Sequence, residues 1–296
     1  MRRYFDRTVW AHLRVPFSLF LMPVFGFALS QASRPDAART TWAFVILHLL
    51  IYPASNAYNS YYDRDQGPIG GLEKPPPVDT RLLHVAWVLD AAGLVLGAWL
   101  VGLPFAGAML VYGLVSRAYS YEGIRLKKYP VVSWLVVGSF QGAFTYLTVS
   151  QAIDAVPLAE LAAARYLIPS LLSTLNLLAF YPLSQIYQHD EDARRGDLTL
   201  SRLLGVRGTF LVAGGFFVGA AVGFLLFFRD ERLGGVPAGW VLVALLVPAV
   251  LYFLAWGWRA WNKPERADFQ ATMRLTVLGS QGLNLFFVLL LLQRFG

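Results

Sequence analysis

Long runs of apolar residues recur along almost the whole chain and are separated by shorter polar stretches. A helix needs about 20 mostly apolar residues to cross the hydrocarbon core of a membrane. Nine segments approach that requirement: residues 15–32, 41–62, 83–102, 104–121, 131–151, 166–187, 209–228, 237–258 and 275–293. The pattern therefore predicts an all-α, polytopic membrane protein, with residues 1–296 in one integral-membrane domain.

The composition agrees with this prediction. Hydrophobic residues make up 56% of the chain and charged residues 15%, whereas a soluble domain is about 25% charged. So few charges cannot coat a water-facing surface, which excludes a disordered chain and most soluble enzymes. The chain has 0 cysteines, so disulfides, thiol catalysis and zinc–thiolate sites are excluded as well.

The basic residues predict the orientation in the membrane. If the nine helices alternate in direction, 19 of the 25 lysines and arginines fall on the side of the N-terminus. Because cytoplasmic loops carry the excess of basic residues, the N-terminus is expected in the cytoplasm and the C-terminus outside. We expect the cell inner membrane as the location. The net charge of +7 then marks topology and membrane lipid contact, and no nucleic acid partner is expected.

Two cytoplasmic loops hold most of the polar side chains that could carry chemistry. In both, the polar run begins before the apolar helix has ended. Asn59 and Asp63 are four residues apart, as are Gln188 and Asp192, so each pair lies on one face of a helix. A single charge beside a membrane is usually only solvated. Two matched clusters on one side of the membrane instead predict a site.

The residue types in these clusters favour binding of a diphosphate through magnesium. Mg²⁺ takes oxygen ligands from carboxylates and from substrate phosphates. Two helix ends, each with an oxygen-bearing pair, could hold magnesium ions against one diphosphate, and nearby arginine and lysine side chains could neutralise the remaining charge. A third polar segment, Tyr119-Ser120 followed by Arg125-Leu126-Lys127, lies between them in sequence. Its composition alone also fits an interfacial anchor.

With these motifs the chain resembles the UbiA superfamily of intramembrane prenyltransferases. Family members carry an Asn-Asp-x-x-x-Asp motif after their second helix, an Asp-x-x-x-Asp motif after their sixth, and a Tyr-Ser/Thr…Arg-Leu-Lys stretch between their fourth and fifth. The first two motifs correspond here to Asn59-Ser60-Tyr61-Tyr62-Asp63 and Gln188-His189-Asp190-Glu191-Asp192. Ser60 and Gln188 replace aspartates of the family pattern, so we expect a divergent member.

The resemblance implies helices around a central cavity and Mg²⁺-dependent transfer of an isoprenyl group from a prenyl diphosphate to a lipophilic acceptor, aromatic acceptors included. The metal ligands it implies are Asn59, Asp63, Asp65, Gln188 and Asp192. The diphosphate contacts it implies are Arg64, Lys74, Arg125, Lys127 and Arg194. Asp63, Asp192 and Tyr119 are the expected catalytic residues, with Tyr119 positioning the diphosphate or a departing proton.

Four amides within the predicted helices are candidates for the acceptor pocket. An amide in the membrane is costly unless it bonds a partner or lines a polar cavity. These residues are Gln141, Asn176, Gln281 and Asn284. Hydrogen bonding between helices is the alternative role for each of them.

Two other functions remain open at the level of sequence. A terpene cyclase of the same fold would capture the allylic cation within its own chain and need no acceptor. A transporter or binding protein for an anionic lipid would also place polar residues at helix breaks, although such sites usually lie near the membrane midplane. The polar residues here gather at one face, which favours the transferase.

Overall fold

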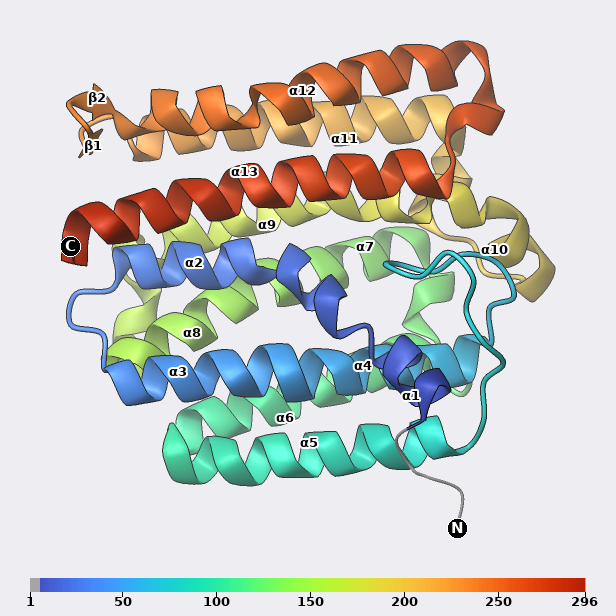
Figure 1. Ribbon diagram of the computed structural model, residues 1–296, viewed down its shortest axis with the longest axis horizontal. Coiled ribbons are helices and arrows are strands. Elements are labelled where there is room, and N and C mark those ends of the chain that lie inside the picture. Colours follow the sequence, from blue (N-terminus) through green and yellow to red (C-terminus); the bar gives the residue numbers. More distant parts are fainter. Residues whose placement is uncertain (1–5, 296) are drawn as a thin grey trace.

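Between residues 6 and 295, which are the residues that the computed structural model describes, nine helical passes run side by side (Figure 1). Seven helices in this range are long and apolar enough to cross a membrane, and a bent pair at the start of the chain gives an eighth. The remaining pass, α6 (Leu103–Ser120), is less apolar than these eight but packs against α5 (Arg81–Leu100). The prediction of an all-α membrane protein is confirmed.

The first five passes are α1 (Arg7–Leu13) with the 3₁₀-helix η1 (Val15–Phe20) and α2 (Met22–Gln31); α3 (Ala37–Val45) with the π-helix η2 (Ile46–Ile51) and α4 (Tyr52–Asp63); α5 (Arg81–Leu100); α6 (Leu103–Ser120); and α7 (Pro130–Ser139) with the π-helix η4 (Phe140–Phe144) and α8 (Thr145–Asp154). The other four are α9 (Ala164–Gln185), α11 (Leu200–Phe227), α12 (Ala238–Asn262) and α13 (Phe269–Phe295). Short elements connect them: η3 (Leu126–Lys128), η5 (Leu158–Ala162), η6 (Ile186–Gln188), α10 (His189–Arg195), β1 (Arg232–Leu233), β2 (Val236–Pro237) and η7 (Pro264–Arg266).

Two predicted helices differ from the observed ones. The segment 15–32 is not one straight helix, because η1 and α2 meet at an angle and the pair is bent by 41°. Pro16 and Pro23 each start a new helical segment there, since proline cannot donate the backbone hydrogen bond that would continue a helix. The segment 209–228 begins earlier than predicted, at Leu200, because α11 continues through a kink at Gly205.

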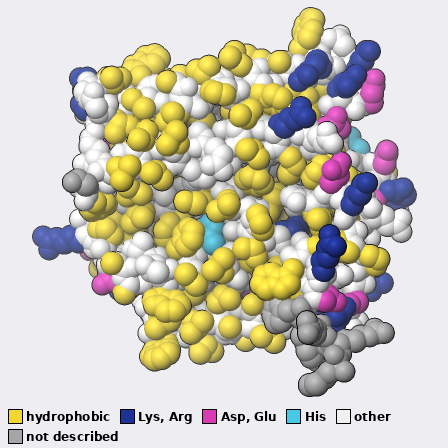
Figure 2. All heavy atoms as spheres, in the orientation of Figure 1, with side chains coloured by type: hydrophobic (Ala, Val, Ile, Leu, Met, Phe, Trp, Pro, Cys, Tyr) yellow, Lys and Arg dark blue, Asp and Glu magenta, His cyan; other side chains and the backbone are white. Residues whose placement is uncertain are grey.

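The two ends of the bundle differ in chemistry. Apolar side chains cover most of the face in Figure 2, and charged side chains gather at the end where α10 and the long loop after α4 lie. At the opposite end, aromatic side chains fill the space between helices: Phe27 stacks on Phe287 with ring centroids 5.0 Å apart, and Phe228 packs on Phe286. These rings close much of the space between the helices at that end.

Close contact between η4 and α9 is made possible by a glycine. A Cβ on Gly142 would lie 2.6 Å from the Thr174 Cα, which is backbone and cannot move aside without moving the helix. The Ala143 amide donates to the Thr174 hydroxyl at 2.9 Å in the same place. These two contacts fix η4 against α9 at mid-bundle.

We expect Gly142→Ala to destabilise the protein by about 1–3 kcal/mol, the usual cost of overpacking a tight contact. Gly107→Ala is the matched control, because nothing lies within 4 Å of the Cβ it would add. Thermal unfolding in detergent measures both variants. Equal stability of the two would show that the η4–α9 contact does not constrain the fold.

Candidate active site

A cavity of about 300 Å³ lies between α2, α4, α6, α7, α9 and α13 and reaches the α10 end. Its walls are mainly apolar along the helices. At the α10 end it is lined by oxygen-bearing side chains that both predicted clusters supply: Asn59, Asp63, Asp65, Gln188 and Asp192. The fold thus brings the two clusters, far apart in sequence, to one cavity mouth.

The first cluster stands on the last turn of α4. The Asn59 amide donates to Asp63 Oδ2 at 2.7 Å and to the Ser120 hydroxyl at 3.0 Å. The helix stops at Asp63 because Arg64 takes the left-handed conformation, with φ +47°. Asp63 is 3% exposed, and its other oxygen, Oδ1, has no hydrogen-bond partner among the described residues. The prediction that Asn59 and Asp63 lie on one face of a helix is confirmed.

The second cluster follows the end of α9. One 3₁₀ turn, η6, separates α9 from α10 and turns Gln188 and Asp192 into the cavity together. The Gln188 amide nitrogen donates to the Pro68 carbonyl at 3.0 Å, which leaves its amide oxygen free to face a ligand. Asp192 is buried and accepts a hydrogen bond from the Thr199 hydroxyl at 3.1 Å.

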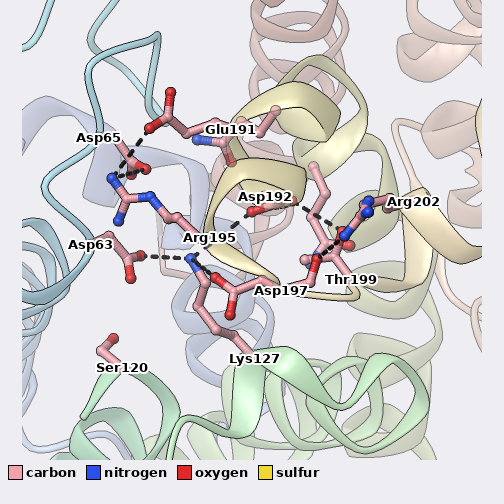
Figure 3. Close-up of polar contacts among 12 residues, drawn as sticks. Asp63, Asp65, Ser120, Lys127, Glu191, Asp192, Arg195, Asp197, Thr199 and Arg202 are labelled. Carbon is pink, nitrogen blue, oxygen red and sulfur yellow. Dashed lines mark hydrogen bonds and ion pairs between the residues drawn. The ribbon is translucent and has the colours of Figure 1, made fainter. Parts of the chain in front are cut away.

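Lys127 joins the two clusters. Figure 3 shows its side chain reaching from the loop between α6 and α7 into the carboxylates. Its ammonium lies 3.0 Å from Asp63 and 4.0 Å from Asp192. Burial disfavours the charged form of the Lys127 ammonium. The neighbouring carboxylates favour that form more strongly and raise the pKa of Lys127 to about 12. Lys127 is therefore a permanent cation at the centre of the site, and its role as a phosphate contact stays a prediction.

Asp197 completes this network and is not among the predicted site residues. Arg125 binds it through two hydrogen bonds of 2.7 Å each, and Lys127 lies 3.3 Å from it. Burial would raise the pKa of Asp197, but the hydrogen bonds from Arg125 and the charge of Lys127 hold it below the ordinary value. Asp197 is only 1% exposed, so its position is that of an internal counterion for the two cations.

Asp65 lies at the rim of the cavity and pairs with Arg195 at 3.3 Å. Burial, together with the nearby carboxylate of Asp63, raises the pKa of Asp65 to about 6. Burial and Asp63 therefore outweigh the neighbouring cations Arg195 and Lys127 at this carboxylate.

Several predicted contacts lie away from the cavity. Arg64 and Lys74 are exposed on the loop after α4, and Arg194 is exposed and pairs with Glu191 at 2.6 Å. Gln281 is exposed on the outer surface of α13, and Asn284 donates to the Leu19 carbonyl at 3.4 Å. The other two amides, Gln141 and Asn176, line the cavity as predicted.

Arg14 is a cavity residue that the sequence did not reveal, because it reads as one of several basic residues near the N-terminus. It is 8% exposed and lines the cavity, in a left-handed conformation that ends α1. Its guanidinium donates to the carbonyls of Gly70 and Asn56 at 3.3 and 3.2 Å. Its Nε has no partner, and no carboxylate among residues 6–295 forms an ion pair with it.

Tyr119 faces the cavity from α6, and its hydroxyl forms a short hydrogen bond with the hydroxyl of Tyr181 on α9. Both rings lie deeper in the bundle than the carboxylates, because they precede Ser120 and Gln188 on helices that run towards the α10 end. The hydroxyl pair therefore marks the boundary between the charged mouth and the apolar walls.

The donor set fits magnesium only when a diphosphate is also bound. Among residues 6–295, no three histidine or acidic side chains come close enough to form a metal site by themselves. Asp63 Oδ1, which lies 3.5 Å from the Arg125 guanidinium but has no hydrogen-bond partner among the described residues, and the carboxylate of Asp192 are nonetheless hard oxygen donors at the same cavity mouth. Mg²⁺ is commonly held by one or two carboxylates plus substrate phosphates, and these residues supply that protein contribution.

Comparison with known proteins decides the family. The chain matches the UbiA prenyltransferase family over residues 19–287. The chain belongs to this family. Among curated proteins, it is 30% identical over 225 residues to a digeranylgeranylglyceryl phosphate synthase of Natronomonas pharaonis, an alignment that covers 74% of this chain and 75% of that protein.

Solved structures show the same UbiA fold. A UbiA homolog from Archaeoglobus fulgidus, bound to DMAPP and Mg²⁺, superposes with a TM-score of 0.66 at 15% identity and covers 96% of this chain and 99% of its own. A UbiA homolog from Aeropyrum pernix K1 gives a TM-score of 0.63 at 17% identity, with 98% and 99% covered. The protein is thus an integral membrane prenyltransferase of the UbiA family, as the motifs indicated.

We expect Asp197→Asn to lower the free energy of unfolding by about 3–5 kcal/mol, because it leaves two buried cations short of a counterion. Asp190→Asn is the control, since Asp190 is exposed on the neighbouring helix α10. Thermal unfolding in detergent, followed by size-exclusion chromatography, compares them. If Asp197→Asn matches the wild-type protein in stability, Asp197 is not the counterion that holds the loops together.

Proposed function

We propose that this protein transfers a prenyl group from a prenyl diphosphate to a lipophilic acceptor that carries an anionic headgroup, with Mg²⁺ as cofactor. The observation that carries the proposal is the charge arrangement of one cavity. Its mouth combines carboxylates with the buried ammonium of Lys127, and its walls are apolar. A prenyl diphosphate likewise has a charged end, which suits the mouth, and a hydrocarbon chain, which suits the apolar walls.

The chain's own residues account for the ionisation of the donor. Bound magnesium would supply electrostatic stabilisation of the leaving diphosphate. Lys127 lines the cavity mouth and remains charged, so it would favour the departure of diphosphate. Arg125 supports it from behind, bound to Asp197. Phe140, Phe180 and Tyr181 line the adjacent wall, where aromatic faces stabilise an allylic cation and exclude the water that would quench it.

Arg14 is the group that we assign to the acceptor. A buried guanidinium with no acidic partner is costly, and an anionic headgroup beside the cavity mouth would supply the missing charge. The similarity to a synthase whose product is named as a phosphate ester supports this choice. Arginine also suits phosphate because its planar group can donate two parallel hydrogen bonds.

The orientation follows from the same charges. The mouth lies at the end where the charged side chains gather (Figure 2), and the excess of basic residues assigns that end to the cytoplasm. In a bacterial or archaeal cell the proposed location is the cell membrane, with the site open to cytoplasmic prenyl diphosphates.

The test is a transfer assay with purified protein, Mg²⁺, labelled prenyl diphosphates and total membrane lipid. We expect Asp63→Asn and Asp192→Asn each to lower transfer by at least about a hundredfold, because each removes a carboxylate that would hold magnesium. Asp190→Asn should keep wild-type activity, and chelation of the metal should abolish it.

The same assay separates the other functions. Release of diphosphate without added lipid would indicate a cyclase. Binding of prenyl diphosphate without release under any condition would indicate a binding or transport protein. Full transfer activity in both aspartate variants would contradict the proposed metal ligands.

The role of Arg14 predicts a separate kinetic effect. Arg14→Lys should raise the KM for the lipid acceptor by about tenfold or more and leave the KM for prenyl diphosphate unchanged, since lysine cannot replace a planar, multiply bonded guanidinium. Arg7→Gln, which alters an exposed arginine on the same helix α1, should change neither value. Treating the lipid with a phosphatase should remove the acceptor, and unchanged transfer after that treatment would argue against a phosphate headgroup.

A further inference from the structure

A buried ion pair lies between α5 and α6, within the membrane-spanning part of the bundle. Arg117 stands three residues before the end of α6 and pairs with Asp90, which follows the first residue of α5 by nine. Nine residues correspond to about 14 Å along the helix axis. Both side chains are buried. Ionisable groups inside a membrane are costly and are usually retained for a function.

The direction of the Arg117 side chain is unusual for its position. An arginine near the end of a membrane helix ordinarily extends its charged group towards the interface. Arg117 instead points away from the α10 end: its guanidinium donates to the Gly113 carbonyl, one turn deeper, at 3.3 Å, and meets Asp90 there. An arginine that served only to mark topology would need no buried partner.

Aromatic rings from two further positions enclose the guanidinium. It lies 4.8 Å from the ring centroid of Tyr58 on α4 and 4.4 Å from that of Trp87 on α5, and ring faces at such distances attract a cation. The helices α4, α5 and α6 lie side by side (Figure 1), and Arg117 contacts a side chain on each of the other two. We refer to Tyr58, Trp87, Asp90 and Arg117 as the clamp.

The clamp stands beside the first cluster of the cavity mouth. Tyr58 is the chain neighbour of Asn59, and Arg117 precedes Ser120 by three residues on α6. The Asn59 amide nitrogen donates to both Ser120 and Asp63, which leaves the Asn59 amide oxygen to face a ligand. The bond to Ser120 requires that α4 and α6 keep one register along their axes.

The contacts of α4 with α6 inside the cavity are weak by comparison. They are neutral hydrogen bonds: Asn59 to Ser120, and Ser55 with Ser116 four residues earlier on both helices. Such bonds between membrane helices average only about 0.6 kcal/mol. Sliding of α6 along α5 would separate Arg117 from Asp90 and leave two buried charges unpaired, which is far more costly. The clamp therefore fixes the register that the hydrogen bonds need.

We propose that the clamp positions the metal-binding side of the cavity. It holds α4 and α6 in the register in which Ser120 orients Asn59, and Asn59 in turn orients Asp63. The inference rests on the proposed function, because the ligand that Asn59 and Asp63 would meet is magnesium with diphosphate. Ser116, Tyr119 and Ser120 face the cavity from α6, whereas Arg117 lies on another face of that helix. Arg117 is therefore a positioning residue.

The experiment measures binding without turnover. Isothermal titration calorimetry gives the Kd of the purified protein for inorganic diphosphate, at one fixed Mg²⁺ concentration and again without Mg²⁺. The double variant Asp90→Asn/Arg117→Gln removes both charges together, so that no unpaired charge stays buried. With Mg²⁺ we expect its Kd to rise about fivefold, the effect of losing about one hydrogen bond. Without Mg²⁺ it should bind as weakly as the wild-type protein.

Trp87→Leu is a milder variant that keeps the ion pair. Trp87 is exposed on α5, so its replacement leaves the packed core intact. It removes one of the two rings on the guanidinium and should raise the Kd with Mg²⁺ about twofold. This variant tests the clamp even if the double variant fails to fold.

Ser120→Ala tests the route of the effect. Alone it should raise the Kd with Mg²⁺ about fivefold, since it removes the bond that orients Asn59. Combined with Asp90→Asn/Arg117→Gln, it should raise the Kd little further, because both changes break the same chain of contacts. Independent effects would multiply to about twenty-fivefold.

Glu160→Gln/Arg165→Gln is the matched control. Arg165 pairs with Glu160 at 3.0 Å and lies 4.7 Å from the centroid of the Tyr166 ring, so it has the same kinds of contact at the opposite end of the bundle. Phe228→Leu controls for stability alone, because Phe228 is buried in the aromatic packing at that end. Both controls should keep the wild-type Kd.

Failure of this inference is distinguishable from failure of the proposed function. If the wild-type protein binds no diphosphate with Mg²⁺ and turns over no prenyl diphosphate, the proposed function is wrong. If the wild-type protein binds it and both clamp variants bind it equally well, the clamp does not position the site. An equal loss of affinity without Mg²⁺, or a twenty-fivefold loss in the combined variant, would also overturn the inference and leave the clamp a general structural role.

Discussion

The structure depends on the balance of buried charge at the α10 end of the bundle. Lys127 contacts Asp63, at the end of α4, and Asp192 and Asp197, within and just after α10. In a medium of low dielectric constant, an unpaired charge is far more costly than the net gain from any one ion pair. The ends of α4 and α10 and the loop before α7 therefore have to meet, because none of them can bury its charge alone.

This constraint also explains why the site and the fold cannot be separated. The hydrophobic faces of the helices would tolerate sliding along their axes, since lipid is as apolar as the leucines that face it. The contacts of Lys127 and the paired hydrogen bonds between Arg125 and Asp197 remove that freedom at one end. At mid-bundle, the close approach of Gly142 to Thr174 likewise prevents the helices from sliding along their axes. The cavity lies between these two fixed levels.

The sequence predicted the features that depend on local pattern. Apolar runs placed most helices within a few residues, and the spacing of Asn59 and Asp63 predicted their shared face because helical periodicity is a local property. The sequence could not distinguish Gln141 from Gln281, because both are single amides in apolar helices. Only the packing of neighbouring helices decides which of them lines the cavity. For the same reason Arg14 read as a marker of topology, although the break in the first pass turns it inwards.

The substitution at Gln188 can be understood from the same balance. Four carboxylates lie at or directly behind the cavity mouth, Asp63, Asp65, Asp192 and Asp197, and four cations lie with them, Arg14, Arg125, Lys127 and Arg195. A fifth carboxylate at position 188 would leave the empty site one negative charge in excess, which favours a metal ion bound before the substrate. With glutamine there, these four carboxylates are matched by the four cations. Under the proposed function, magnesium and diphosphate would then bind together, because only the pair brings both the positive charge that Asp63 and Asp192 would hold and the negative charge that Lys127 would contact.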